Sequence, residues 1–315
     1  MHAAVLTDLK RWRRLGLAIL LGHLILVAAT RGIRLDHLAI DAIYAALMLY
    51  GGFPCRLALL SLPFWLVAVC YSDLLPWALE FRGPIHVGDL YDAERHWFGF
   101  NGSSGREIWP DFFREHHWTA LDLLCGPVYL CVWIEMIPFA LYLSLKDPAR
   151  LSRLMWTYLA AHLAGFATWV LYPAAPPWYV ELHGTGPAVL GTVSNAAGLA
   201  RLDQILGIDL VQGLYGRSVN VFGAMPSLHI AAPTVFLCIA AGMGRTWIMG
   251  ASLFAAIMAF SAVYFRHHYI LDVLAGAGYA CGAYATVVTV ENWLFGSVGS
   301  TQAPLPEQIP CELST

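Results

Sequence analysis

The feature that most constrains the fold is a series of apolar stretches, each near the length of a membrane-spanning helix. A helix needs about 20 mostly apolar residues to cross a bilayer. Hydrophobic residues make up 58% of the 315-residue chain and charged residues 12%, whereas a soluble domain averages about 25% charged residues. This composition excludes a disordered chain, a nucleic-acid-binding protein and an ordinary soluble enzyme. The predicted spans are residues 15–30, 37–51, 57–80, 119–145, 154–172, 227–243, 246–265 and 269–295.

We therefore predict an all-α fold, a polytopic membrane helix bundle with eight spans. The second stretch is short, so seven spans is the alternative. Residues 15–29 also have the composition of a signal-peptide core, because basic residues precede them and Ala28-Ala29 follow. No internal repeat is visible in the sequence, which disfavours a transporter built from inverted repeats.

The distribution of Lys and Arg predicts the orientation in the membrane. Nine of these residues fall on each side of the predicted spans. Those on the N-terminal side lie in short segments close to span ends, whereas most of the others are diluted through two long loops, 81–118 and 173–225. Because dense positive charge in short loops stays in the cytosol, we expect a cytosolic N-terminus and two extracytoplasmic long loops. The aromatic-rich loop 81–118 is expected to form short interfacial helices.

A first cluster of candidate functional residues runs from Phe222 to His229, in the order Phe-Gly-Ala-Met-Pro-Ser-Leu-His. Proline favours the first turn of a helix, and no capping side chain stands directly before Pro226. Free N–H groups at a helix start can bind phosphate, Ser227 can add a hydroxyl, and His229 projects from the same turn. A plain proline-initiated helix explains this segment equally well.

A second cluster, Arg266 to Asp272, opens the last span. His268 and Asp272 are four residues apart and share one face of a helix. A carboxylate on one imidazole nitrogen leaves the other nitrogen free as a nucleophile. Metal binding is disfavoured because the adjacent His267 and His268 point to different faces, and none of the seven cysteines forms a CxxC pair. We expect no metal and no cofactor, and both clusters at the same membrane face.

Other polar residues in the spans are given lesser roles. Glu135 and His162 are predicted to pair in a structural bond below the site, and Asp122, near the outer end of its span, is a weaker candidate for the site. Six further histidines have no partner pattern and are interpreted as incidental. They are His2, His23, His37, His86, His96 and His183.

The two clusters resemble the second and third motifs of the type 2 phosphatidic-acid phosphatase superfamily. The similarity is greatest to the branch that contains fungal inositol phosphorylceramide synthase, with sphingomyelin synthases as more distant kin. It covers roughly residues 150–280 and not the first part of the chain. The strings that carry it are Tyr172 to Tyr179 (YPAAPPWY), Gly198 to Asp203 (GLARLD), Leu206 to Asp209 (LGID), Val221 to His229 and His267 to Asp272.

The resemblance implies a fold and a set of roles. The fold is a six-helix core, placed here at 57–296 behind extra N-terminal spans at 1–56 and before a polar tail at 297–315. His268 would take the phosphoryl group, Asp272 would orient it, and His229 would act as general acid and then general base. The first motif, with Tyr172, Pro176, Pro177, Trp178 and Tyr179, would shape one wall of the site.

The sequence departs from the phosphatases of the superfamily at two cationic positions. Those enzymes have a Lys and an Arg in the first motif and a Ser-Arg before the third, where this chain has Tyr172-Pro173 and Ser261-Ala262. A transferring phosphodiester carries less charge than a monoester, so the departures favour head-group transfer. The groups available to replace the missing cations are Arg201, Arg217, Arg266 and, as a further option, His267.

The sequence therefore predicts an integral membrane phosphotransferase that moves a phospholipid head group to a lipid hydroxyl, such as that of ceramide, through a phosphohistidine. Inositol phosphate is suggested as the head group only by the fungal resemblance. The expected partners are a phospholipid donor, a lipid-alcohol acceptor and the membrane, and not nucleic acid. Two alternatives remain: a lipid-phosphate phosphatase that uses water as acceptor, and a transporter or pH-gated membrane protein that uses the histidine pairs.

Overall fold

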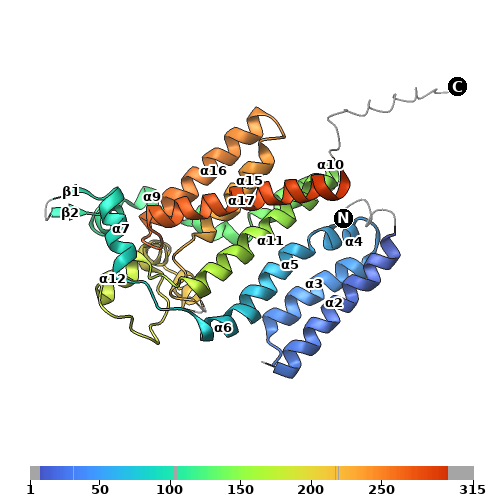
Figure 1. The fold of residues 1–315 in the computed structure, drawn as a ribbon, viewed down its shortest axis with the longest axis horizontal. Helices are drawn as coiled ribbons and strands as arrows, with labels where there is room; N and C mark the ends of the chain where they lie inside the picture. The colour runs from blue at the N-terminus through green and yellow to red at the C-terminus, as the bar shows by residue number, and fades with distance from the viewer. Residues whose placement is uncertain (1–7, 31, 103–104, 217, 219, 297–315) are drawn as a thin grey trace.

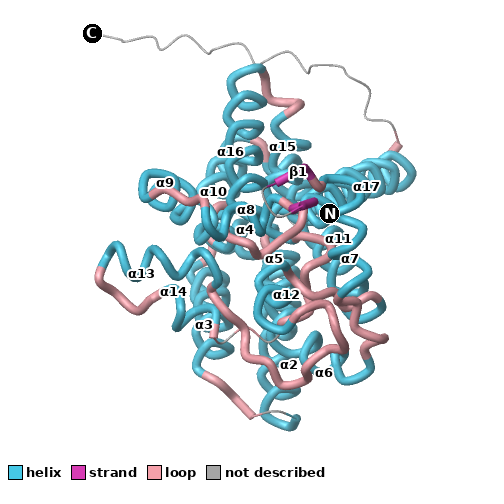
Figure 2. Tube along the Cα trace, turned by 90° about the vertical axis from the view of Figure 1, so that its left-hand side faces the viewer, coloured by secondary structure: helices cyan, strands magenta, loops and turns pink. Residues whose placement is uncertain are grey.

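The computed structural model describes residues 8–30, 32–102, 105–216, 218 and 220–296. Within these ranges the chain consists of helices joined by loops, with a single two-stranded sheet (Figure 2). The all-α, polytopic fold class predicted from the sequence is confirmed. Each of the eight predicted stretches contains a helix or a broken helix pair.

The N-terminal part is a helical hairpin followed by a segmented rod (Figure 1). The hairpin consists of α2 (Leu9–Thr30) and α3 (Leu35–Tyr50). The rod is interrupted by a π-helical turn, where the i→i+5 bonding pushes one residue out of register. Its segments are α4 (Gly52–Leu60), α5 (Leu62–Val69), the π-turn η1 (Cys70–Leu74), α6 (Leu75–Ala78) and the 3₁₀ turn η2 (Leu79–Phe81).

The remaining long helices form the core of the bundle, in which α15 packs against α11, α16 and α17. The predicted span 119–145 is a broken helix here, because Pro127 lies inside α9 and a 3₁₀ turn follows. The elements are α9 (Thr119–Leu130), η3 (Cys131–Trp133), α10 (Met136–Lys146), α11 (Pro148–Leu171), α15 (Leu228–Ala240), α16 (Arg245–Tyr264) and α17 (Ile270–Phe295).

The two long loops contain short elements at one end of the bundle. Loop 81–118 forms the short helices expected from its aromatic residues, and also a β-hairpin that was not predicted. Its elements are α7 (Gly88–Phe98), β1 (Phe100–Gly102), β2 (Gly105–Glu107) and α8 (Trp109–Glu115). Loop 173–225 contains α12 (Pro177–His183), η4 (Ala197–Ala200), α13 (Arg201–Leu206) and α14 (Val211–Tyr215).

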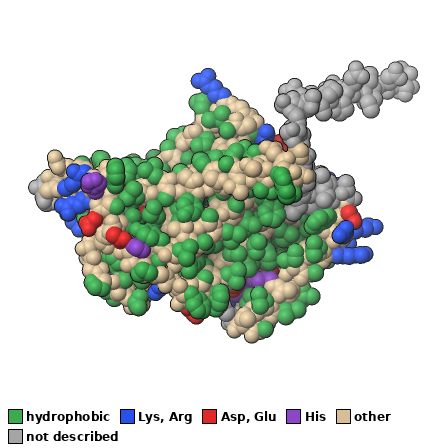
Figure 3. Space-filling model, viewed as in Figure 1, with side chains coloured by type: hydrophobic (Ala, Val, Ile, Leu, Met, Phe, Trp, Pro, Cys, Tyr) green, Lys and Arg blue, Asp and Glu red, His purple; other side chains and the backbone are tan. Residues whose placement is uncertain are grey.

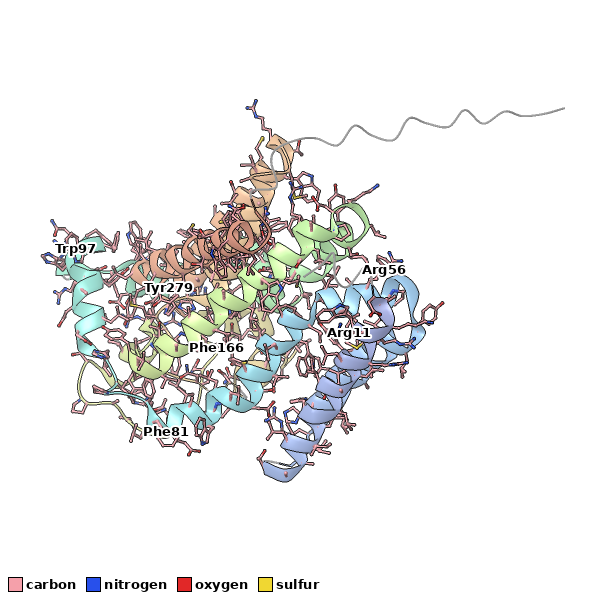
Figure 4. All side chains as sticks on the ribbon, turned by 45° about the vertical axis from the view of Figure 1, so that its right-hand side comes forward. Arg11, Arg56, Phe81, Trp97, Phe166 and Tyr279 are labelled. Atoms are coloured by element: carbon pink, nitrogen blue, oxygen red, sulfur yellow. The ribbon has the colours of Figure 1, made fainter. Side chains whose placement is uncertain are left out.

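The surface is that of an integral membrane protein. Apolar side chains cover the flanks of the helices, while charged side chains gather toward the ends (Figure 3). Arg11 and Arg56 lie at one end, and Phe81 and Trp97 at the opposite end (Figure 4). Five described helices are long and apolar enough to cross a bilayer, and four others are apolar but shorter. The five are Leu9–Thr30, Leu62–Phe81, Pro148–Leu171, Arg245–Tyr264 and Ile270–Leu294.

Helices α15 and α17 approach each other closely at Gly276. A Cβ at this position would lie 2.1 Å from the Ser227 carbonyl oxygen and 2.5 Å from Ile230 Cγ2. The Ser227 N–H also donates to the Asp272 carbonyl at 3.0 Å. The starts of the two helices are therefore joined through main-chain atoms, without room for a side chain between them.

We predict that Gly276→Ala destabilises the protein by about 1–3 kcal/mol, because the added methyl forces the two helices apart. Gly278→Ala is the matched control on the same helix, since a Cβ there meets nothing within 4 Å. Thermal unfolding in detergent should show a lower midpoint for the first variant and an equal or higher one for the second. Equal midpoints for the two variants would contradict the close approach.

Candidate active site

The structure brings the two predicted histidines together. His229 is the second residue of α15, and His268 lies in the turn before α17. His268 Nε2 and His229 Nδ1 are 3.4 Å apart. Both side chains line one cavity of about 500 Å³. A single phosphoryl group entering this cavity can therefore contact both imidazoles.

His268 is held in one tautomer by its surroundings. Its Nδ1 donates to the Ala224 carbonyl at 2.9 Å, and the Asp272 Oδ2 atom lies 3.5 Å from the same nitrogen. A carbonyl can only accept, so Nδ1 carries the proton and Nε2 keeps its lone pair. Asp272 is fully buried, and its Oδ2 accepts the Tyr269 N–H at 2.8 Å.

Main-chain hydrogen bonds hold three segments, which are far apart in the sequence, side by side. The Ala174 N–H donates to the Phe222 carbonyl at 2.8 Å, and the Ala224 N–H donates to the Ala174 carbonyl at 3.2 Å. On the other side, the Ala175 N–H donates to the His86 carbonyl at 2.8 Å. The first-motif string therefore lies between the loop that precedes α7 and the segment that leads to His229.

The start of α15 differs from the predicted one. The helix begins at Leu228, two residues after Pro226, and Ser227 occupies the N-cap position without a side-chain cap bond. Ser227 Oγ is buried and has no hydrogen-bond partner among the described residues. N–H groups without a side-chain cap thus lie at the helix start that carries His229, as in helix starts that bind phosphate, whereas Ser227 does not line the cavity.

Two tyrosine rings pack against the histidines of the cavity. Tyr129 stacks on His229 with ring centroids 4.2 Å apart, and His267 packs against Tyr215 at 4.6 Å. His267 Nε2 donates to the Ala196 carbonyl at 3.1 Å. Burial, with the neighbouring His268, lowers the pKa of His267 to about 3. His267 is therefore neutral at neutral pH and does not supply a cation.

The predicted arginines lie outside the cavity or outside the described residues. Arg201 pairs with Asp122 through three contacts of 2.8–3.1 Å, and Arg266 pairs with Glu181. Arg217 is not among the described residues. Among the residues that the structure describes, no Lys or Arg lines the cavity.

The first-motif residues divide between the cavity wall and its support. Pro176 and Trp178 line the cavity, whereas Pro177 and Tyr179 are buried behind it. Tyr172 stacks on His86 at 3.7 Å and also lies outside the lining.

Expectations for three polar groups in the spans were wrong. Glu135 and His162 do not pair: neither Glu135 carboxylate oxygen has a hydrogen-bond partner among the described residues, and His162 Nδ1 donates to the Tyr158 carbonyl at 2.8 Å. His162 lines the cavity rather than lying below it. Asp122 faces Arg201 rather than the histidines.

Two histidines interpreted as incidental also have partners that spacing did not indicate. His23 lies against Asp41, and His37 lies within 3.0 Å of Asp73. These partners are 18 and 36 residues away in the sequence, so only the packing of separate helices brings them together.

The chain matches known proteins in the part that carries the site. Residues 91–286 match the PAP2 superfamily. The chain belongs to the PAP2 superfamily. It is 38% identical over 284 residues to the phosphoinositol dihydroceramide synthase of Bacteroides thetaiotaomicron, a match that covers 88% of each chain.

Two fungal relatives match this PAP2 protein over shorter ranges. The inositol phosphorylceramide synthase of Candida albicans is 33% identical over 164 residues, which cover 50% of this chain and 34% of the relative. The catalytic subunit of the Saccharomyces cerevisiae synthase is 34% identical over 110 residues, which cover 34% and 27%. No solved structure matches the chain. The PAP2 protein is thus an integral membrane lipid phosphotransferase of the inositol phosphorylceramide synthase branch.

Sequence reasoning missed two residues of this PAP2 site. Asn220 lines the cavity, and its amide has no hydrogen-bond partner among the described residues. A Cβ at Gly223 would lie 2.4 Å from Asn220 Nδ2, so any other residue there would require the Asn220 amide to move. Glu94, on α7, accepts the Ile270 and Leu271 N–H groups at 2.9 and 3.0 Å. A carboxylate from loop 81–118 thus caps the helix that carries Asp272, a contact that no local pattern indicates.

Glu94 makes stability depend on pH. Burial, and to a smaller extent the Asp272 carboxylate, raises the pKa of Glu94 from 4.5 to about 7, while the two backbone N–H groups oppose the rise. Because the folded protein holds this proton more tightly than the unfolded chain, the contribution is full below about pH 4.5 and is lost as the pH rises through about 7.

We therefore expect the melting temperature of the wild-type enzyme to fall relative to that of Glu94→Gln between about pH 5 and about pH 8, since the amide cannot ionise. Asp92→Asn, which removes an exposed carboxylate from the same helix, is the control and should show no such trend. A difference between wild type and Glu94→Gln that stays constant with pH would count against the assignment.

Proposed function

We propose that this enzyme transfers phosphoinositol from a phospholipid to the hydroxyl of a ceramide-type lipid, with His268 as the nucleophile. The observation that carries the proposal is the 3.4 Å approach of His268 Nε2 to His229 Nδ1 on the wall of a shared cavity. The names of the bacterial and fungal relatives support the choice of head group and acceptor.

The reaction has two displacements that balance without an outside reagent. His268 Nε2 attacks phosphorus, the bond from phosphorus to the diacylglycerol oxygen breaks, and His229 gives its proton to that oxygen. The acceptor hydroxyl then returns a proton to His229, attacks phosphorus and releases His268. The covalent intermediate divides one difficult displacement into two easier ones.

The charge on the phosphoryl oxygens is stabilised by hydrogen-bond donors rather than by cations. The donors are the N–H groups at the start of α15, which has no side-chain cap bond. Such preorganised donors are effective in a water-poor site. A phosphodiester keeps one negative charge throughout both steps, so it suits a cavity whose described lining lacks Lys and Arg. A phosphomonoester, with up to two charges, suits it less.

Asp272 and the Ala224 carbonyl act on His268 rather than on the substrate. Both lie against Nδ1, where they hold the ring orientation and stabilise the positive charge that forms when Nε2 bonds to phosphorus. The density of Lys and Arg in short segments supports an extracytoplasmic site with a cytosolic N-terminus. Both lipids then reach the cavity from the outer part of the bilayer.

We expect His268→Ala to abolish head-group transfer and His229→Ala to slow it by about 10²–10⁴-fold, the usual contribution of a general acid–base group. Asp272→Asn should also abolish transfer, and all three proteins should still fold. The measurement is conversion of labelled phosphatidylinositol and ceramide by purified protein, with thermal unfolding as the folding check. His183→Ala, which removes an exposed imidazole outside the cavity, is the control.

The same assay distinguishes transfer from hydrolysis. Wild-type protein given a lipid phosphomonoester should release little phosphate, because the described lining of the cavity has no Lys or Arg to bind a doubly charged phosphate. Rapid phosphate release without head-group transfer, or full transfer by His268→Ala, would refute the proposal.

A further inference from the structure

A second polar cluster lies within the N-terminal helices, away from the reacting histidines. It consists of His23 on α2, His37 and Asp41 on α3, and Asp73 on the π-turn η1, and we call it the N-terminal polar cluster. His23, His37 and Asp41 are each at most 7% exposed. Ionisable groups inside a membrane bundle are costly to bury, so each needs a physical explanation.

One side of the cluster is fully bonded and has the features of a structural network. Asp41 Oδ2 lies 2.7 Å from His23 Nδ1, and Asp41 Oδ1 accepts the Trp65 indole N–H at 2.7 Å. These bonds join α2, α3 and α5. Asp41 does not line a cavity among the described residues.

The other side of the cluster leaves polar atoms unused. His37 Nε2 and Asp73 Oδ1 are 3.0 Å apart, yet their geometry makes no hydrogen bond, and neither atom has another partner among the described residues. Ser72 Oγ donates to Asp73 Oδ2 at 2.8 Å. A buried polar atom without a partner costs about 1–3 kcal/mol. Because His37 Nδ1 accepts the Arg34 N–H, the ring proton is on Nε2, and no hydrogen bond among the described residues uses it.

The unused side faces the same cavity as the reacting histidines. His37 and Ser72 line this cavity, as do His23 from the bonded side and the reacting His229 and His268. The rest of the lining is mainly apolar and aromatic, with Val69, Tyr71 and Leu214 among its members. The π-turn places Ser72 and Asp73 here, and such turns frequently occur at functional sites. The π-turn joins α5 to α6, and Figure 1 shows α6 at the end of this rod opposite α4.

We propose that His37 and Ser72, with Asp73 behind them, form a second polar subsite of the reaction cavity, which binds a hydroxyl or amide group of a lipid substrate. The inference rests on the proposed function. The ligand group must donate to Ser72 Oγ, whose own proton goes to Asp73, and accept from His37 Nε2, which hydroxyl and amide groups do and acyl chains do not. Two sources have this chemistry: the polyol head group of the donor, and the amide and secondary hydroxyl of the acceptor. The subsite gives the extra N-terminal helices a role in selecting the substrate.

The test compares variants of the unused side with a variant of the bonded side. His37→Phe keeps a ring and removes the polar atoms, His37→Gln restores a polar group near the Nε2 position, and Ser72→Ala removes the hydroxyl. Asp41→Asn is the matched control, because it is buried in the same cluster and does not line the cavity. Initial rates in mixed detergent micelles give kcat and KM for phosphatidylinositol and for ceramide separately.

We expect His37→Phe and Ser72→Ala to raise KM for one lipid about fivefold with little change in kcat, as the loss of one or two hydrogen bonds implies. His37→Gln should recover part of this loss. Asp41→Asn should lower the melting temperature without changing either KM. A rise in KM for ceramide that is absent with an acceptor lacking its secondary hydroxyl assigns the subsite to the acceptor. A rise for phosphatidylinositol that is absent with phosphatidylglycerol assigns it to the donor.

Unchanged KM values in His37→Phe and Ser72→Ala would overturn the subsite. The subsite would also be overturned if these variants and Asp41→Asn lost kcat and melting temperature to the same extent. A measurement without turnover separates this result from failure of the proposed function. Phosphatidylinositol or ceramide, added singly, should raise the melting temperature of wild type and His268→Ala alike, and should raise that of His37→Phe less. If wild type transfers no head group but this difference remains, the subsite stands and the proposed reaction falls. If the difference is absent, the subsite falls.

Discussion

The active site depends on the close crossing of α15 and α17 at their starting turns. The Ser227 N–H bonds the Asp272 carbonyl, and Gly276 leaves no side chain between the helices. Each helix start carries one imidazole, so this main-chain contact sets the distance between His229 and His268. The Ala224 carbonyl, from the segment that enters α15, then fixes the tautomer of the histidine that belongs to α17. The two motifs position each other, and neither would hold its histidine in place alone.

The treatment of charge follows from the low polarity of the surroundings. Arg201 and Arg266 each form an ion pair with a carboxylate from another element, because an unpaired buried cation is costly. Glu94 reaches α17 from loop 81–118, and its carboxylate satisfies two N–H groups that the helix cannot satisfy itself. The described part of the cavity is left with neutral donors. Neutral donors suit a singly charged phosphodiester. This agrees with the branch of the PAP2 superfamily to which the chain is similar.

Much of the fold was predictable because membrane spans are encoded locally. The apolar runs mark where helices lie, and the aromatic residues of loop 81–118 mark its short helices. Pro127 could have indicated the break in the span 119–145, but the length of the apolar run led to the prediction of one continuous span. The β-hairpin and the π-turn had no comparable signal, since each depends on one or two backbone bonds rather than on a pattern of side chains.

The sequence by itself determined that the chain crosses a membrane as helices and that His229, His268 and Asp272 share a site, because apolar length and short motifs are local properties. Only the tertiary structure decided which polar groups meet. It paired Asp122 with Arg201 rather than with the site, left Glu135 without His162, and joined His23 and His37 to Asp41 and Asp73. These outcomes depend on how separate helices rotate and cross, and on the free energy of satisfying every buried polar group at once. No single segment contains that information.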